Sequence, residues 1–337
     1  MRIALVLFLC AAARATNPNA VNEANTGLSF AHDGKYGEAI KHYRAAIAID
    51  PRLPGIQLNL GLAYFKLNRL PEAATAFEQA IKSDPTSFQA RVLLGMSYYG
   101  CRRFDAAATE LKRAAGEQPG NTELRFKLAQ SYLWSNQYDQ AKDEFRFLLT
   151  KDPESAQVHM LLGQVYDAAN QQDSATTEFE AAVKAAPREP EVHFGLGYLY
   201  WKQKKYEDAK KEFLAELANQ PQHTQALTYL GDAELNTSGN AREHLETALK
   251  LDPNLRLARL DLGIILAEDN NPEAALQLQE AIRLDPSKPD AHYRLGRLWK
   301  SMGREKDAAA EFAKVKDLAQ NEHQDPLIKV RPGEPAP

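Results

Sequence analysis

PGIQLNLGLAYFKLNRLPEAATAFEQAIKSDPTS, residues 54–87, reads as two helices joined by a short turn. In its first half, Leu60, Tyr64 and Leu67 recur at a spacing close to the roughly 3.6 residues of a helical turn. Their side chains therefore share one face of a predicted helix. An apolar face of this kind is buried against another element, so the stretch predicts a helix that packs on a neighbour.

The second half of the stretch repeats the pattern and adds signals for close packing and for an end. Ala73, Phe77 and Ala80 share one face of a second helix. Gly61 and Ala73 are small, which lets the two helices cross closely. Pro85 lacks an N–H group and disfavours helical geometry in the residue before it. It is therefore predicted to end the second helix.

The stretch is one member of a series with a nearly constant period. The series is marked by Pro51, Pro85, Pro119, Pro153, Pro187, Pro221, Pro253 and Pro286. The first six lie 34 residues apart, and the last two intervals are 32 and 33 residues. A period of this length is typical of a helix-turn-helix solenoid, in which each unit contacts its neighbours. The fold class predicted is all-α.

The pattern resembles the tetratricopeptide repeat family. Positions are counted from the first residue of each unit, so that residue 54 is position 1 of the second unit. Glycine at position 8 occurs as Gly27, Gly61, Gly95, Gly163, Gly197, Gly231, Gly263 and Gly296. Alanine at position 20 occurs as Ala39, Ala73, Ala107, Ala141, Ala175, Ala209, Ala241, Ala274 and Ala308. The resemblance implies a right-handed solenoid over residues 16–322. Its nine units lie near residues 20–53, 54–87, 88–121, 122–155, 156–189, 190–223, 224–255, 256–288 and 289–322.

Two features depart from the family pattern. The tryptophan usual at position 4 is replaced, and two of the replacements are His159 and His193 in adjacent units. A metal site needs further ligands, but the same position in the flanking units holds Arg125 and Leu227. We therefore expect a structural role for the imidazoles and no metal or other cofactor. The loop between the two helices is shorter in units seven and eight. Glu234 stands at position 11 of unit seven, where each of the earlier units has Phe or Tyr. We expect altered twist or a partner contact there.

The ends of the chain differ from the repeats. Residues 1–15 read as an export signal, with Arg2, an apolar core and a small-residue cleavage site before Thr16. We expect an exported protein, periplasmic or extracellular, with no transmembrane span in the mature chain. Cys10 leaves open a lipid anchor, and an uncleaved N-terminal anchor is the other alternative. Residues 323–337 are rich in proline and predict a disordered tail.

Motifs for catalysis and for nucleic-acid binding are missing from the sequence. It contains no phosphate-binding loop, no H-E-x-x-H zinc motif and no G-x-S-x-G elbow, which predicts a protein that is not an enzyme. Lysines between residues 202 and 211 are interleaved with acids, and the chain has a net charge of −4. Nucleic-acid binding normally needs a field of one sign, so we predict none.

Function is therefore expected on the surface that the repeats assemble. In the resembled family the first helices line a concave groove, and positions 2, 5, 9, 12 and 13 face it. Aromatic and apolar residues at those positions usually mark an interaction site when they are exposed. The alternative is ordinary packing between neighbouring first helices. The predicted groove residues are Leu58, Leu62, Phe65, Val92, Met96, Tyr99, Phe126, Gln130, Trp134, Met160, Gln164, Phe194, Tyr198 and Trp201.

Together these features predict a non-catalytic scaffold that binds an apolar or extended peptide segment of a partner protein. The alternative is a glycan-binding accessory subunit of an envelope polysaccharide or glycan-modifying machine, because aromatic rings stack on sugars as well as on peptides.

Overall fold

The computed structural model describes residues 17–324. The predicted export segment and most of the predicted tail lie outside these residues. Over the described part every regular element is an α-helix, and the chain divides into two compact units, residues 1–153 and 154–337. No described helix is long and apolar enough to cross a membrane.

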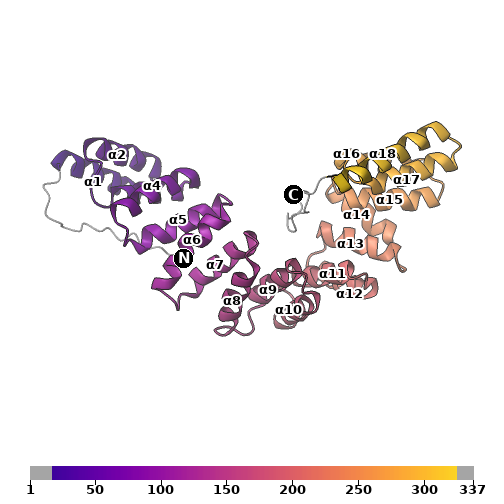
Figure 1. Ribbon diagram of the computed structural model, residues 1–337, viewed down its shortest axis with the longest axis horizontal. Coiled ribbons are helices and arrows are strands. Elements are labelled where there is room, and N and C mark those ends of the chain that lie inside the picture. The colour runs from indigo at the N-terminus through magenta and orange to yellow at the C-terminus, as the bar shows by residue number, and fades with distance from the viewer. Residues whose placement is uncertain (1–16, 325–337) are drawn as a thin grey trace. The chain divides into compact units, whose positions relative to one another are not determined.

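In the first unit, eight helices follow one another as pairs (Figure 1). They are α1 (Pro18–His32), α2 (Tyr36–Ile49), α3 (Ile56–Lys66), α4 (Leu70–Ser83), α5 (Phe88–Gly100), α6 (Phe104–Glu117), α7 (Thr122–Trp134) and α8 (Tyr138–Leu149). Each helix packs on the next, and the first helices of successive pairs also contact one another. The first unit is therefore a helical solenoid, as the period of the sequence predicts.

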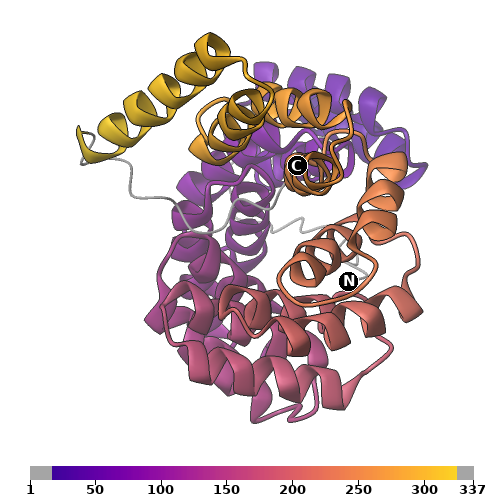
Figure 2. The same ribbon diagram turned by 90° about the vertical axis from the view of Figure 1, so that its right-hand side faces the viewer.

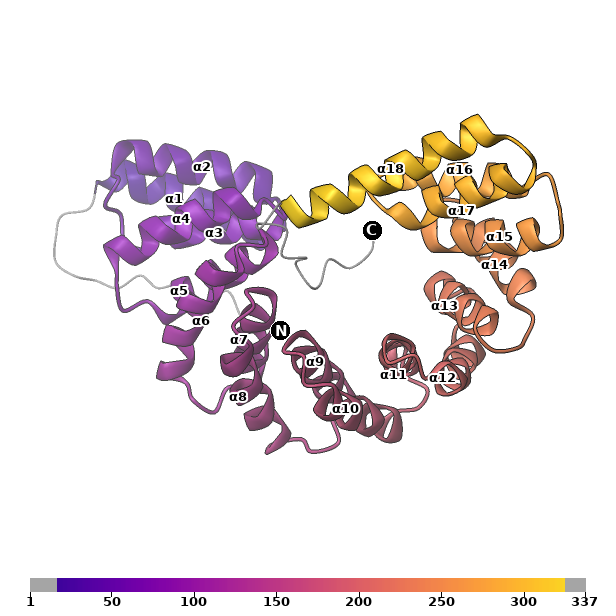
Figure 3. The same ribbon diagram turned by 45° about the vertical axis from the view of Figure 1, so that its right-hand side comes forward.

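The second unit is built in the same way. Its helices are α9 (Ala156–Ala168), α10 (Gln172–Ala185), α11 (Val192–Lys202), α12 (Tyr206–Asn219), α13 (Thr224–Leu235), α14 (Ala241–Leu251), α15 (Arg256–Glu268), α16 (Ala274–Leu284), α17 (Pro289–Ser301) and α18 (Glu305–Gln324). The odd-numbered helices contact one another in series, and α9, α11 and α13 lie on one side, with α10 and α12 on the other (Figure 3). We call the surface formed by the odd-numbered helices of a unit its first-helix face.

The glycine at position 8 is explained by the ring or leucine at position 24 of the same repeat. A Cβ atom on Gly61 would lie 2.5 Å from Cε1 of Phe77, and one on Gly95 would lie 2.7 Å from Cγ of Leu111. Such distances are too short for any real contact, so only glycine lets the two helices approach this closely. The alanine at position 20 lies at the same crossing, and Ala73 is fully buried there.

Both ends of the second helix follow from local chemistry. Most first helices close with a residue of positive φ, among them Asn68, Arg102 and Lys204 with φ of 56°, 58° and 58°. This left-handed residue lets the chain reverse into the next helix. At the other end, Asp84 has extended geometry directly before Pro85, and α4 stops at Ser83, which confirms that this proline ends its helix.

The residues at position 4 replace the missing tryptophan with polar links inside each repeat. Arg125 Nη1 lies 2.6 Å from Glu144 Oε2 of the paired helix, and its Nε donates to the carbonyl oxygen of Pro119. His193 makes the same two contacts, with Glu212 Oε2 at 2.6 Å and the Pro187 oxygen at 3.0 Å.

Histidines elsewhere at this position follow the same rule. His159 and His292 each place Nδ1 beside a glutamate nineteen residues later. The structural role expected for His159 and His193 is therefore what the contacts show, although it rests on side-chain contacts with a glutamate and not on ring packing alone. Each link ties a first helix to its own second helix, so it stabilises the repeat from within.

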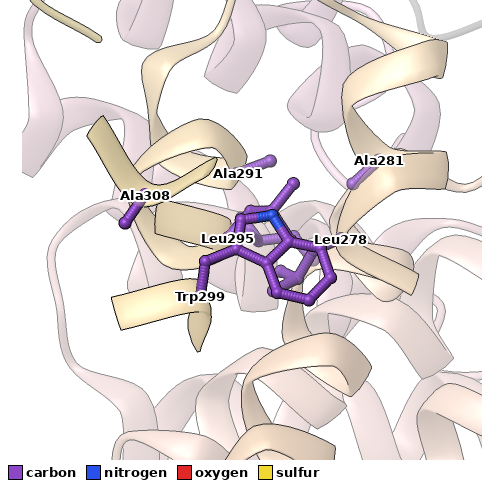
Figure 4. Packing of buried hydrophobic residues seen from close by; sticks show 7 residues of the cluster. Leu278, Ala281, Ala291, Leu295, Trp299 and Ala308 are labelled. Carbon is purple, nitrogen blue, oxygen red and sulfur yellow. The ribbon is translucent and has the colours of Figure 1, made fainter. Parts of the chain in front are cut away.

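The C-terminal repeat shows how a unit buries its apolar residues. Trp299 of α17 lies over Leu295 and Leu278, with Ala308 of α18 nearby (Figure 4). The Arg304 guanidinium lies 3.7 Å from the centre of the Trp299 ring and covers its outer face. Because α18 has 20 residues and α17 has 13, α18 continues beyond the segment that pairs with α17, as the yellow helix in Figure 2 shows. It includes the first two residues of the predicted tail.

Candidate binding surface on the first helices

An aromatic cluster covers the first-helix face of the second unit where α11 and α13 meet. Phe194, Tyr198 and Trp201 are spaced four and three residues apart, so they form one stripe along α11. Tyr229 of α13 lies against this stripe, with its ring centre 4.8 Å from that of Trp201 and 5.1 Å from that of Tyr198. Both contacts are edge-to-face, the arrangement that aromatic pairs prefer. We call these four residues the aromatic cluster.

The aromatic cluster is anchored below and left partly exposed above. Its rings pack against the buried side chains of Phe213 and Leu230, yet none of the four is itself fully buried. Burial raises the pKa of the Tyr229 hydroxyl. The aromatic cluster therefore fits both explanations considered from the sequence, packing between helices and an interaction surface. Its rings pack on buried side chains, and part of each ring is exposed to solvent.

The start of α11 is held rigidly by its own repeat. Glu216 of α12 is completely buried and accepts hydrogen bonds from the backbone N–H groups of Glu191 and Phe194 at 3.0 and 3.1 Å. His223 accepts from Ala226 N–H at the start of α13, and its other ring nitrogen lies 3.1 Å from Glu191 Oε1. These caps satisfy helix N-termini that would otherwise carry unpaired donors. They fix the positions of both helices that carry the aromatic cluster.

A row of carboxylates continues from the aromatic cluster across α13 and α15 to α17. The Trp201 indole N–H donates to Asp232 Oδ2. Asp261 of α15 is only 3% exposed, and its Oδ2 has no hydrogen-bond partner among the described residues. Burial, then the negative charges of Asp232 and Asp290, hold the pKa of Asp261 well above its usual value of 3.8. We call Asp232, Asp261 and Asp290 the acidic row.

Two arginines border the acidic row without pairing with Asp261. Arg256 Nη2 binds Asp290 Oδ1, while the buried Nε of Arg256 has no hydrogen-bond partner among residues 17–324. Arg256 and Arg294 both lower the pKa of Asp261, but by less than burial and the acids raise it. Burial also raises the pKa of Asp232, against the effect of its bond from Trp201. At Asp261, burial and the two neighbouring acids therefore outweigh the two arginines.

A second, smaller group lies on the first-helix face of the first unit. Phe104 contacts the rings of both Tyr99 and Trp134, with ring centres 5.4 and 6.4 Å away. The ammonium of Lys127 lies 4.9 Å from the centre of the Tyr99 ring and donates to Gln130 Oε1 at 2.9 Å. Burial lowers the pKa of Lys127. This group joins three of the predicted groove residues.

The other predicted groove residues take several positions. Leu62 is 7% exposed, so it belongs to the core of its repeat. Met160 packs on the buried cluster around Ala182 and Val192, and Phe126 contacts the buried Phe145 ring edge-to-face. The rest are half-buried on first helices: Leu58, Phe65, Val92, Met96 and Gln164.

The sequence prediction omits Tyr229, Asp261 and Lys127, all at position 6 of their repeats. The family pattern places positions 2, 5, 9, 12 and 13 on the groove, and position 6 is not among them. Asp261 carries a detectable signal, since it is the one charged residue in the otherwise apolar run from Leu260 to Leu266. A charged residue in such a run predicts either a buried ion pair or a functional site.

Family models agree with the arrangement of the helices. A tetratricopeptide repeat model matches residues 58–122, 166–223, 194–241 and 238–281, which together exceed half of the chain. The chain belongs to the tetratricopeptide repeat family. A second tetratricopeptide repeat model matches residues 98–165 and 136–193, and a TPR repeat model matches 27–68 and 266–303. Tetratricopeptide repeats are in general non-catalytic scaffolds for protein interaction.

Solved structures with helical repeats are similar to parts of this tetratricopeptide repeat protein. MamA from AMB-1 is 25% identical, with a TM-score of 0.43, over 49% of this chain and 90% of its own. YrrB, described as a TPR protein with an unusual peptide-binding site, is 22% identical, with a TM-score of 0.44, over 53% and 94%. Human IFIT1, solved as a dimer with m7Gppp-AAAA, is 17% identical, with a TM-score of 0.45, over 89% and 72%. A search of curated protein sequences found no match.

Proposed function

We propose that the protein is a non-catalytic scaffold that binds an extended peptide segment of a partner protein along the first-helix face of its second unit. The observation that supports this most directly is the aromatic cluster of Phe194, Tyr198, Trp201 and Tyr229, which gathers four partly exposed rings at one place. Large aromatic side chains in one patch are the residues that contribute most binding energy at protein interfaces.

Rigidity is the second support for this site. Because Glu216 and His223 cap α11 and α13 from within the repeat, the rings are held in place before any partner arrives. A surface that is already ordered loses little conformational entropy on binding. A partner segment lying across α11 and α13 would meet ring faces and edges that already have fixed positions.

Tests of both ligand classes on the full chain distinguish peptide binding from glycan binding. We would pan a library of random peptides against the protein and, in parallel, incubate it on a glycan array. The peptide proposal expects enriched sequences whose affinity falls at least about 10-fold in Tyr198→Ala, as for an interface hot spot. Tyr206→Ala, which truncates a tyrosine at the start of α12, is the matched control and is expected to retain affinity.

The melting temperature of each variant decides how a loss of binding is understood. A Tyr198→Ala protein that melts like the parent and no longer binds supports the surface. Binding to sugars alone would replace the peptide proposal by the glycan-binding alternative. Enriched peptides that bind Tyr198→Ala as well as the parent would place the partner elsewhere on the chain.

Export remains a proposal from the sequence. We infer that residues 1–15 direct the chain out of the cytoplasm and are removed. N-terminal sequencing of the mature protein is expected to start at Thr16, and an intact Met1 on soluble cytoplasmic protein would contradict the inference.

A further inference from the structure

We propose that Asp232 and Asp261 form a pocket for one cationic side chain, an arginine or lysine, carried by the bound peptide segment. This inference rests on the proposed function, since the pocket adjoins the aromatic cluster on the same first-helix face. It goes further by naming the chemistry that the partner must present.

The first step is the state of Asp261. A carboxylate removed from water needs hydrogen bonds or an opposite charge, because the desolvation of an unpaired charge is costly. Asp261 is 3% exposed, and its Oδ2 has no hydrogen-bond partner among the described residues. Asp261 Oδ2 is therefore an acceptor without a hydrogen-bond donor among the described residues.

The second step is that the neighbouring charges do not meet this need. Facing Asp261 are Asp232 from α13, Asp290 and Arg294 from α17, and Arg256 from its own helix. Arg256 is engaged by Asp290 through Nη2. Three acids, Asp232, Asp261 and Asp290, therefore stand against two cations, Arg256 and Arg294. The pocket therefore keeps an excess of negative charge that a further cation would neutralise.

The third step is the connection to the aromatic cluster. Asp232 accepts the indole N–H of Trp201, so one acid of the pocket is bound directly to a cluster ring. The Trp201 ring in turn meets Tyr229 at 4.8 Å. Ring faces attract cations, and an arginine or lysine stem packs on apolar surface while its charged end reaches a carboxylate. A peptide seated on the rings could therefore extend a basic side chain toward Asp232 and Asp261.

A metal ion is a less suitable occupant. Within residues 17–324 no group of three or more His, Cys, Asp or Glu side chains is arranged to hold one. The remaining competitor is a proton, which would neutralise Asp261 without any ligand. A test must therefore distinguish a bound cation from simple protonation.

The first experiment uses a small probe, so it does not depend on finding a peptide. N-acetyl-arginine amide is titrated into the full chain while the three indole N–H signals are followed by NMR. We expect the Trp201 signal to move and those of Trp134 and Trp299 to stay. N-acetyl-citrulline amide, which has almost the same shape and no charge, is expected to leave Trp201 unchanged. A Trp201 signal that ignores arginine, or that responds equally to citrulline, would overturn the cation pocket.

Variants locate the effect. Asp261→Asn is expected to weaken the arginine response at least about 10-fold, as for the loss of a buried charge partner. Glu268→Gln removes one negative charge from the same helix at an exposed site, so it is the matched control. An equal loss in both variants would show only a general field effect and would refute the pocket.

The peptides selected by panning separate this inference from the proposed function. Replacing their basic residue by citrulline is expected to weaken binding to the parent strongly and binding to Asp261→Asn little, a pattern that a double-mutant cycle measures. If citrulline peptides bind the parent fully while Tyr198→Ala still abolishes binding, the peptide surface stands and the cation pocket is wrong. If no peptide is enriched, the NMR titration alone decides the pocket.

Discussion

The ring of Phe77 occupies the space that any side chain on Gly61 would need, since an ideal Cβ would lie 2.5 Å from its Cε1. Phe77 is fully buried, so other side chains enclose its ring. The pair sets the distance between α3 and α4, and the same relation recurs between Gly197 and Phe213 in the second unit.

Gly61→Ala is therefore expected to destabilise the first unit by about 1–3 kcal/mol, the usual cost of overpacking a close-packed core. The measurement is urea unfolding followed by circular dichroism. Gly37→Ala is the control, because nothing lies within 4 Å of a Cβ at that helical site. There the substitution is expected to stabilise by up to about 1 kcal/mol through helix propensity. Changes of the same sign at both sites would contradict the packing argument.

Arg125→Ala tests the polar link inside a repeat. The substitution removes the contact with Glu144, the bond to the Pro119 carbonyl and the stacking on Phe147, whose ring centre lies 4.1 Å away. A loss of about 1.5–3 kcal/mol is expected for charged hydrogen bonds at a half-buried site. Arg113→Ala removes an exposed arginine that pairs with Glu110 of the same helix and should cost at most about 0.5 kcal/mol. Comparable losses in both variants would argue against a special role of position 4.

Lys204→Gly tests the strain in the turn after α11. Lys204 has a φ of 58°, a left-handed geometry that is unfavourable for residues with a Cβ. Glycine adopts it freely, so the variant should gain about 0.5–1 kcal/mol in free energy of unfolding. Lys211→Gly, in the middle of α12, serves as the opposite control and should lose about 1 kcal/mol. A loss of stability in Lys204→Gly would show that the lysine side chain matters more than its backbone.

The pH dependence of stability reports on Asp261. Its pKa is raised in the folded protein by burial and by Asp232 and Asp290, against the charges of Arg256 and Arg294. A group with a higher pKa in the folded state favours folding below its unfolded pKa, and this contribution is lost as pH rises through the folded pKa.

Asp261→Asn should therefore be more stable than the parent near neutral pH, by about 1–3 kcal/mol for relief of an unpaired buried group. The gap should be smaller at about pH 5 than at about pH 7.5. Urea unfolding of both proteins at the two pH values measures it, with Glu268→Gln expected to show no such gap. A gap that does not change with pH would mean that Asp261 is ionised to the same extent in the folded and the unfolded protein over this range, so that its pKa is not raised by folding.

The repeat period predicts the fold because the same residues recur at the same structural positions. Gly61 and Ala73 lie at the helix crossing, and Pro85 ends its helix, as their spacing indicates. The binding surface is less predictable, because whether Leu62 or Tyr198 is buried depends on the helix next to it. Leu62 is in the core, whereas Tyr198 joins the aromatic cluster. The role of Asp261 also escapes the pattern, since its charged neighbours come from three different helices.

The two short repeats of the second unit have a consequence for cooperativity. Helices α14 and α16 have 11 residues each, and Glu234 is paired with His244 where the pattern has an aromatic ring. Each repeat in the stack contacts only its nearest neighbours. A weak interior repeat therefore lowers the coupling between the unfolding of the repeats on one side of it and the unfolding of those on the other. A ligand lying across α11, α13 and α15 would bridge this weak point. We expect such a ligand to make the opening of the flanking repeats more concerted, so that hydrogen exchange in α11 and α17 becomes coupled when the surface is occupied.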